Sequence, residues 1–323
     1  MRRIDGENDL LLTCAHIPDG IAILRCETCD DTVRLPDEID GAPVVQLGPY
    51  ALSERAPDLS GQETFAVRIA CGGPEPVHDA NAVRAVTLPA ALQSVGSYAF
   101  YNCRRLETIT LPHTVSDFGG GALMNCRALR EVVLRAEPTV PTCLQKLLGE
   151  HAGELDVRFD GGASAHLLFP AYTEELEDLS PAHIFQRRIH GAGYGYRQCF
   201  DAGVLSLRQY DLALAGLLER HDFAVASQVA ARRLAVPYAL SDTARDAYLD
   251  CLRAHGGALL CHCAAMGESA AVSFLLSLGV LTAADVEAAC DAAREKEQTA
   301  ALSVLLAATG KTAARGRAKT FDL

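Results

Sequence analysis

Cysteine and histidine side chains gather near the N-terminus in a spacing that zinc sites use. Cys14 and His16 are separated by one residue, and Cys26 and Cys29 are separated by two. A Cys-x-x-Cys pair on a tight turn, with a second pair a loop away, can supply four tetrahedral ligands. However, Cys26 follows an alternating apolar run that begins at Ile21, and cysteines in such strands are commonly buried. We therefore expect no metal and no cofactor, and we keep these four residues as the alternative metal site.

Other chemical motifs are absent or incomplete. Cys261, His262 and Cys263 are adjacent, and neighbouring residues of a helix point about 100° apart, so they cannot chelate one ion together. The sequence has no G-x-S-x-G and no H-E-x-x-H, so we expect a protein that is not an enzyme. A metal-dependent regulator that uses the Cys and His clusters, or an enzyme of another type, remains the alternative.

Arginine, glycine and tyrosine dominate the segment 187–197. Its three glycines would allow a ligand to approach the backbone closely, and its arginines with a histidine could hold an anion. It is not a dinucleotide fingerprint, because it follows a predicted helix rather than a strand. The interpretation that we favour over anion binding is a packed loop whose tyrosines dock on the last repeat of the preceding domain. The side chains concerned are Arg187, Arg188, His190, Tyr194, Tyr196 and Arg197.

The elements that would position these residues begin with an internal repeat. Segments 85–107 and 108–130 share nine identities in 23 positions, among them Leu88/Leu111, Asn102/Asn125 and Cys103/Cys126. The apolar residues of each repeat follow L-x-x-L-x-L, the pattern of a short strand with alternate side chains turned inward, and the proline after it ends the strand. Each repeat hides its apolar face only against its neighbours, so the pattern predicts a solenoid.

These repeats resemble the BspA-type leucine-rich repeat, whose pattern runs roughly L-x-x-I-x-L-P-x-x-[VL]-x-x-I-G-x-x-A-F-x-x-C. The resemblance covers residues 20–160, and Val33-x-Leu35-Pro36 falls where the opening repeat is expected. Residues 53–82 interrupt it as an insertion with one expected strand, from Phe65 to Ile69. The whole arrangement is similar to bacterial leucine-rich repeat proteins with a helical C-terminal extension. The resemblance implies a fold and no known activity.

The second half of the sequence has helical periodicity. Helix starts are expected at Thr173, Ser180, Ser206, Ser241 and the box Thr282-x-x-Asp285. Helix ends are expected at Gly279 and Gly310. Residues 264–279 look like the second half of an ankyrin repeat and are echoed by residues 291–310, so degenerate ankyrin-like helix pairs and a plain helical bundle are both open.

The sequence thus predicts an α+β repeat protein. A leucine-rich-repeat β-solenoid of about five irregular 23-residue rungs is expected in residues 1–165, an all-helical domain in 166–310 and a basic flexible tail in 311–323. The 29 basic residues against 41 acidic ones give a net charge of −12, the opposite sign to that of most nucleic-acid binders, so no nucleic acid is expected as a partner. No apolar run resembles a signal peptide or a membrane span, which favours the cytoplasm with no membrane contact.

A rigid and extended strand face suits a non-catalytic scaffold that binds another protein, whose identity the sequence does not disclose. At the 23-residue offset, Arg84, Glu107 and Arg130 align in one column and Thr87, Thr110 and Val133 in another. Charges in such columns can pair with each other, and a column of small residues beside them can hold an extended segment of a partner. The predicted partner-binding residues are Arg84, Thr87, Glu107, Thr108, Thr110, Arg130, Glu131, Val133 and Asp156.

Overall fold

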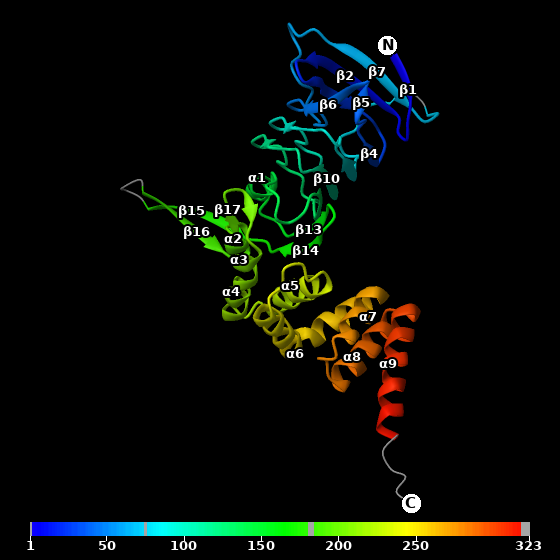
Figure 1. Cartoon of the computed structure of the whole chain (residues 1–323), viewed down its shortest axis with the longest axis vertical. Coiled ribbons are helices and arrows are strands. Elements are labelled where there is room, and N and C mark those ends of the chain that lie inside the picture. Colours follow the sequence, from blue (N-terminus) through cyan, green and yellow to red (C-terminus); the bar gives the residue numbers. More distant parts are fainter. Residues whose placement is uncertain (1, 74–75, 180–183, 318–323) are drawn as a thin grey trace, which may run out of the picture. The chain divides into compact units, whose positions relative to one another are not determined.

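The structure, a computed structural model, describes residues 2–73, 76–179 and 184–317. It divides into two compact units, Met1–Gln209 and Tyr210–Leu323, each of which is described by itself (Figure 1). This division lies well beyond the expected domain boundary at residue 165. The reason is that the chain after residue 165 continues to pair and pack with the repeats before it enters the helical unit.

One sheet of the first unit begins with the N-terminal strands and continues into the turns of the repeats. Its order is β1-β7-β2-β3-β6-β9-β11, with β5 paired to β6. The strand predicted at Phe65–Ile69 is confirmed as β7, which pairs with β2 and β1. The strands are β1 (Arg2–Asp5), β2 (Leu10–Ile17), β3 (Gly20–Glu27), β5 (Glu38–Ile39), β6 (Ala42–Leu47), β7 (Phe65–Ala70), β9 (Ser94–Val95) and β11 (Asp117–Phe118).

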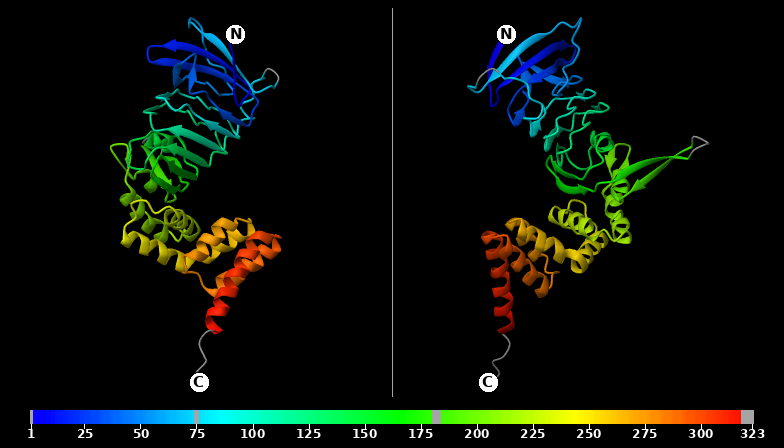
Figure 2. Two further views of the ribbon diagram at one scale, coloured as in Figure 1. Left: turned by 45° about the vertical axis from the view of Figure 1, so that its right-hand side comes forward. Right: turned by 180° about the vertical axis from the view of Figure 1, so that it is seen from behind.

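The second sheet holds the L-x-L segments of the repeats, which Figure 2 shows lying side by side. Its order is β14-β13-β12-β10-β8-β4, and all neighbours are parallel except β13 and β14. Thr110 pairs with Thr87 on one side and with Val133 on the other, which is the predicted 23-residue register. The strands are β4 (Thr32–Arg34), β8 (Ala85–Thr87), β10 (Thr108–Pro112), β12 (Glu131–Arg135), β13 (Leu155–Asp160) and β14 (Ser164–Phe169).

These pairings give a leucine-rich-repeat arrangement of mixed strands and helices. Within the residues that the structure describes, no strand joins one sheet to the other, so a closed solenoid is not seen. Tight turns connect the two sheets instead, and several of their residues have a left-handed backbone. Asn102 (φ 63°) and Asn125 (φ 65°) occupy equivalent turns, and asparagine is one of the few residues that tolerate this conformation.

The core of the repeats lies between the two sheets. Ile109 and Leu111 on β10, and Val132 and Leu134 on β12, are completely buried. Cys103 and Cys126, which stand in equivalent turns, are buried as well, and their thiols donate to the carbonyl groups of Leu52 and Phe100. The repeated apolar positions of the sequence therefore build one continuous core, as stacked repeats require.

Replacing Leu111 with alanine tests this register. Leu111 is fully buried and pairs with Leu134 on the next strand, so Leu111→Ala should lower the free energy of unfolding by about 2–5 kcal/mol. Thr110→Ala, on the outward side of the same strand, should change it by only about 0.5 kcal/mol. Hydrogen exchange of the β10 and β12 peptides measures both values. A loss below about 1 kcal/mol for Leu111→Ala would contradict the inward placement of this side chain.

The segment between the repeats and the helical unit differs from the prediction. Thr173 begins strand β15 (Thr173–Leu179), not a helix, and β15 pairs antiparallel with β16 (Ile184–His190). Pairing between an acidic strand and a basic one overrides the local helix preference: Arg187 binds Glu174, and His190 lies 3.3 Å from Glu175. The helix start expected at Ser180 falls outside the described residues.

The hairpin β15–β16 extends away from the repeats (Figures 1 and 2). Around its base lie α1 (Leu144–Glu150), which precedes β13, and α2 (Gly193–Arg197), which follows β16. A further short hairpin, β17 (Phe200–Asp201) with β18 (Val204–Leu205), leads to the helices. The all-helical domain expected from residue 166 onward therefore begins only after residue 206.

Helix starts and ends in the rest of the chain mostly follow the sequence. Ser241 caps α6, and Thr282 with Asp285 forms the predicted capping box of α8. Gly279, with φ 67°, follows α7 as expected for a helix end. The helices are α3 (Leu207–Leu212), α4 (Leu214–Glu219), α5 (Phe223–Ala235), α6 (Asp242–Ala265), α7 (Ser269–Ser277), α8 (Ala283–Glu295) and α9 (Thr299–Arg317).

The helix end predicted at Gly310 is wrong, and the first part of the expected tail, residues 311–317, is helical, while residues 318–323 lie outside the described residues. Helix α9 continues through Gly310 to Arg317. Ala313, Ala314 and Arg315, which favour helices, lie between the two glycines of this part of α9, Gly310 and Gly316.

Three links between helices of this part of the chain share one backbone geometry. Each link contains one residue with a left-handed backbone: His221 between α4 and α5, Gly267 between α6 and α7, and Glu297 between α8 and α9. In each link the next residue donates its backbone N–H to a carbonyl five positions earlier. The helices therefore come in pairs with equivalent turns, while their relation to ankyrin repeats stays a prediction.

Candidate functional site

The predicted strand-face residues lie on the outward side of the second sheet. None of the nine is buried. Thr87, Thr110 and Val133 are direct neighbours across β8, β10 and β12, as are Thr108, Glu131 and Asp156 across β10, β12 and β13. The structure therefore brings these six residues together in two adjacent columns.

The charged side chains of this face bind each other. The two carboxylate oxygens of Glu107 accept from Arg84 at 2.6 Å and from Arg130 at 2.5 Å. On the next strands, Glu131 accepts from Thr108 and lies 3.2 Å from Arg158. Such exposed pairs stabilise a protein by only about 0–1 kcal/mol each. Their main consequence is that the acidic and basic groups neutralise one another across the repeats.

The column of Thr87, Thr110 and Val133 carries no charge. Its neighbours along the same pairing register are Arg34 on β4 and Arg158 on β13, both exposed. At the β13–β14 edge, His166 binds Asp156. The strand face is thus an uncharged strip of small side chains bordered by paired charges and ended by an arginine at each side.

The turns of the repeats carry two further ladders, which the sequence analysis missed. Asn125 donates to Asn102 at 2.8 Å, and Asn102 donates to Glu54 at 2.9 Å. The rings of Tyr50 and Tyr98 stack with their centroids 5.2 Å apart. The recurrence of asparagine at the 23-residue offset was the available signal for the first ladder.

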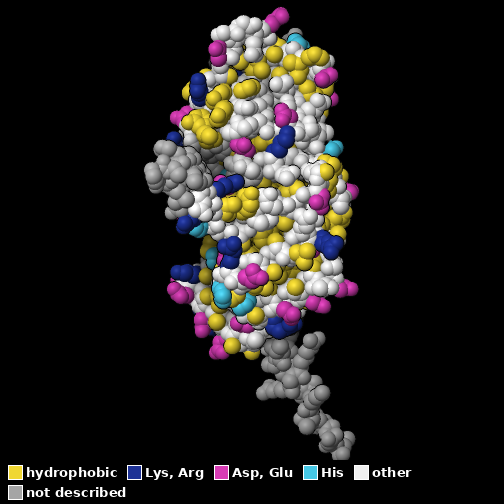
Figure 3. All heavy atoms as spheres, turned by 90° about the vertical axis from the view of Figure 1, so that its left-hand side faces the viewer, with side chains coloured by type: hydrophobic (Ala, Val, Ile, Leu, Met, Phe, Trp, Pro, Cys, Tyr) yellow, Lys and Arg dark blue, Asp and Glu magenta, His cyan; other side chains and the backbone are white. Residues whose placement is uncertain are grey.

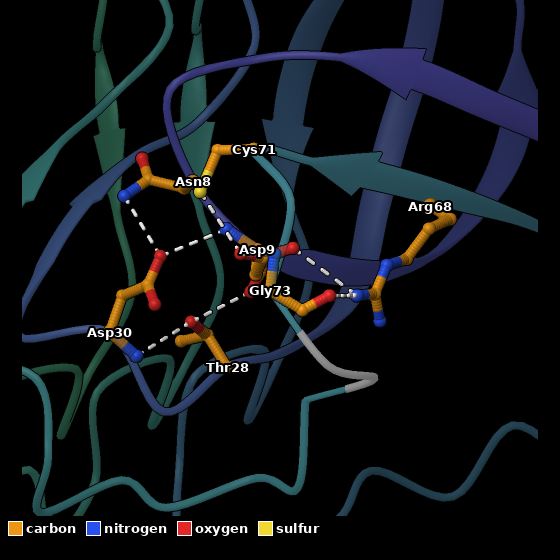
Figure 4. Close-up of polar contacts among 7 residues, drawn as sticks. All are labelled: Asn8, Asp9, Thr28, Asp30, Arg68, Cys71 and Gly73. Carbon is orange, nitrogen blue, oxygen red and sulfur yellow. Dashed lines mark hydrogen bonds and ion pairs between the residues drawn. The ribbon is translucent and has the colours of Figure 1, made fainter.

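A buried carboxylate, Asp9, ties the N-terminal strands together (Figure 4). Its oxygens accept from Arg68 at 3.2 Å, from the Cys71 thiol at 3.0 Å and from the backbone N–H of Gly73 at 2.9 Å. Its own backbone N–H donates to Asp30, and its carbonyl accepts from Thr28. Asp9 therefore connects strand β2 to the chain after β3 and to the end of β7.

This cluster does not activate its cysteine. The hydrogen bond from Cys71 lowers the pKa of Asp9, and the same bond raises the pKa of the Cys71 thiol. A reactive cysteine requires the opposite shift, because the thiolate is the nucleophile. The arrangement is that of a structural hydrogen-bond network.

The fold places the four residues of the alternative metal site in different environments. Cys14 and Cys26 are buried on β2 and β3, where burial raises the pKa of each thiol to about 12. His16 stacks on Phe65 with ring centroids 4.7 Å apart, and Cys29 is exposed. Among the residues that the structure describes, no group of three or more histidine, cysteine or acidic side chains is arranged to hold a metal ion.

The side chains of the segment 187–197 lie in three different places: a pocket, the surface of the hairpin and the core. Arg187, Tyr194 and Arg197 line one pocket. Arg188 stands opposite Glu175 on the neighbouring strand, and His190 contacts that same glutamate. Tyr196 is fully buried.

The side chain of Arg197 is hydrogen-bonded to the protein backbone. It is 4% exposed and donates to the carbonyl groups of His151, Gly153, Pro170 and Gly193. Burial lowers its pKa to about 10, so it remains charged at neutral pH. All five guanidinium N–H donors are used in these bonds, which leaves none for an anion. This part of the segment therefore packs against the chain before β13 and after β14.

The surface on the side of the hairpin shows no single dominant charge. Basic, acidic and hydrophobic side chains are interspersed over the face that Figure 3 displays. Among the described residues, none of the helices has the length and apolar character that crossing a bilayer requires.

Comparison with known proteins agrees with the strand pairing. A family model described as "BspA type Leucine rich repeat region (6 copies)" matches residues 78–141. Among solved structures, the chain is similar to the crystal structure of the T. pallidum Leucine Rich Repeat protein (TpLRR), with 27% sequence identity over 38% of this chain and 68% of that chain and a TM-score of 0.21. No curated protein matches it. The family match, together with the 23-residue pairing of β8, β10 and β12, identifies residues 78–141 as a BspA-type leucine-rich repeat region.

Proposed function

We propose that this protein is a non-catalytic scaffold that binds a protein partner on the outward face of its second sheet. Leucine-rich repeat domains generally mediate protein–protein interaction, and the match to that family supports this class of function. The observation that carries the proposal is the uncharged column Thr87, Thr110 and Val133, which runs in register across three parallel strands.

The charges beside this column support an uncharged contact. Because Glu107 already binds Arg84 and Arg130, a partner gains little by offering a charged group there. The threonines and the valine present methyl groups and hydroxyl groups on a rigid backbone. An extended segment of a partner can lie along them. Because the scaffold is already rigid, it loses little conformational entropy when the partner binds.

The proposed setting is a reducing compartment such as the cytoplasm. All twelve cysteines have free thiols, and most of them are buried. Cys103 and Cys126 stand in equivalent turns of adjacent repeats and bond to backbone carbonyl groups instead of to each other. Buried thiols used in this way are typical of proteins that do not rely on disulfides.

Adding charge and bulk to the column tests the proposal. The double variant Thr87→Arg and Thr110→Arg should abolish capture of the protein's native partners from cell extract, because two arginines fill the uncharged strip. The matched control is Arg104→Ala with Arg127→Ala, on exposed turn positions of the same repeats. Equal recovery of the same proteins by the Thr87/Thr110 variant and by the unmodified chain would exclude this face as the binding surface.

A further inference from the structure

A pocket of about 660 Å³ lies at the base of the β15–β16 hairpin, within the first unit. Its walls come from α1, from the two hairpin strands and from α2. Small-molecule sites commonly have volumes of roughly 300–1,000 Å³. The lining residues are Gln145, Gly149, Glu150, Ala152, Tyr172, Glu174, Arg187, Tyr194, Arg197 and Gln198.

The walls of the pocket are held in place before any ligand arrives. Glu174 binds the Arg187 guanidinium through both of its oxygens. The guanidinium carbon of Arg187 lies 5.4 Å from the ring centre of Tyr194, and that of Arg197 lies 4.9 Å from the ring centre of Tyr172. The two rings meet edge to face, with centroids 5.6 Å apart. Contacts of this kind fix the aromatic side chains and lower the entropy that binding would otherwise lose.

The charges of the pocket are balanced. Two of its lining residues are acidic, Glu150 and Glu174, and two are basic, Arg187 and Arg197. Glu174 and Arg187 satisfy each other, Arg197 is used by backbone carbonyl groups, and Glu150 accepts from the backbone N–H of Gly121 at 2.6 Å. Glu150 and Arg197 keep their formal charges, since each is hydrogen-bonded only to backbone groups. The four charges of the lining sum to zero, so the pocket as a whole favours neither an anion nor a cation.

The groups that remain are neutral. Within the residues that the structure describes, the exposed side-chain amides of Gln145 and Gln198 and the hydroxyl group of the half-buried Tyr194 form no hydrogen bond with the protein. Each of them can both donate and accept. Beside them, the Tyr172 and Tyr194 rings line the pocket, and a guanidinium covers one face of each, so only the ring surface that remains can contact the apolar face of a ligand. A neutral ring with hydroxyl or amide groups on its rim and C–H groups on its face complements this combination.

We propose that this pocket binds a neutral saccharide. The site is independent of the strand face, because none of its lining residues belongs to the two outward columns of the second sheet. Gly149, the penultimate residue of the short helix α1, lies in the wall of this pocket.

The backbone of Gly149 has no positive φ, and a Cβ placed there would meet nothing within 4 Å. A longer side chain at position 149 therefore has room to extend into the pocket, which makes this position suitable for a test of the site.

Saturation-transfer NMR on the full chain tests the proposal with N-acetylglucosamine and methyl glucoside as the neutral probes. Glucuronate and glucosamine serve as the charged probes. We expect signals from at least one neutral probe and weaker signals from both charged ones. Gly149→Leu should weaken binding by roughly tenfold or more, because the leucine side chain fills the pocket. Gly216→Leu is the matched control: it also replaces a helix glycine with open space around it, and it lies outside the pocket.

Three results would overturn the proposal. The first is the absence of a signal from both neutral probes at millimolar concentration. The second is an unchanged affinity in Gly149→Leu. The third is tighter binding of a charged probe than of either neutral one, because that would contradict the charge balance. Native hydrogen exchange of α1 in Gly149→Leu shows that a loss of binding does not arise from a loss of fold.

Discussion

Replacing Asp211 with alanine should destabilise the helical unit by about 3–5 kcal/mol, because it leaves a buried arginine without its counter-ion. Arg233 is completely buried, and its Nε and Nη2 atoms lie 2.8 and 3.2 Å from the carboxylate oxygens of Asp211. Tyr248 donates to the same carboxylate at 2.9 Å. The carboxylate thus joins α3 to α5 and α6, and its loss removes three hydrogen bonds at once.

Hydrogen exchange of the α5 and α6 peptides measures this effect, since it reports the stability of each part of the chain separately. The matched control is Asp250→Ala, which removes an exposed carboxylate that pairs with Arg253 and should change stability by less than about 1 kcal/mol. The double variant Asp211→Leu with Arg233→Met should recover most of the loss, because it buries no unpaired charge. If Asp211→Ala exchanges like the unmodified chain, Arg233 does not depend on this carboxylate.

Replacing Arg197 with methionine should destabilise the end of the repeat unit by about 3–5 kcal/mol. The change removes five hydrogen bonds to four carbonyl groups, of which those of Pro170 and Gly193 are buried, and an unsatisfied buried acceptor costs roughly 1–3 kcal/mol. It also removes the cation above the Tyr172 ring. Arg197→Lys should lose most of the same stability, because a single ammonium group cannot reach carbonyl groups on both sides of the guanidinium.

Hydrogen exchange of β13 and β14 reports the Arg197 effect, since the carbonyl acceptors flank these strands. Arg130→Met serves as the control: this arginine is exposed and makes a surface ion pair, so its loss should change stability by less than about 1 kcal/mol. Full retention of stability by Arg197→Lys would show that charge alone, and not the set of carbonyl contacts, holds the segment.

The repeats could be predicted from the sequence because their information is local and periodic. Leu88, Leu111 and Leu134 recur at one spacing, and stacked repeats convert that spacing directly into strand register. The caps at Ser241 and Thr282 were predictable for a similar reason, since a cap and its partner lie three residues apart.

The hairpin β15–β16 could not be predicted from periodicity. Its first strand has a sequence of good helix formers, and only pairing with the basic second strand makes it a strand. The available signal for a hairpin was the complementary charge of the acidic segment 173–179 and the basic segment 184–190. The interpretation as a helix failed because tertiary pairing outweighed local preference.

The polar sites depend on residues that are far apart in the sequence. Asp211 and Tyr248 are separated by 37 residues, and Asp9 and Cys71 by 62. The pocket at the hairpin base combines Gln145 with Gln198. No spacing rule connects such pairs, so only the folded chain brings them together. Arg197 was singled out as part of a loop that either docks on the repeats or holds an anion, and its actual acceptors, the carbonyl groups of residues 151, 153, 170 and 193, could not be named from the sequence.

Site-specific photo-crosslinking tests the central claim of partner binding on the strand face most directly. A photoreactive amino acid at position 110 lies in the middle of the uncharged column, and one at position 127 lies on an exposed turn of the same repeat. We predict that irradiation in the native cell links a defined protein to position 110 and not to position 127. Crosslinks to the same protein from position 127 alone, or equal crosslinks from both positions, would contradict the account.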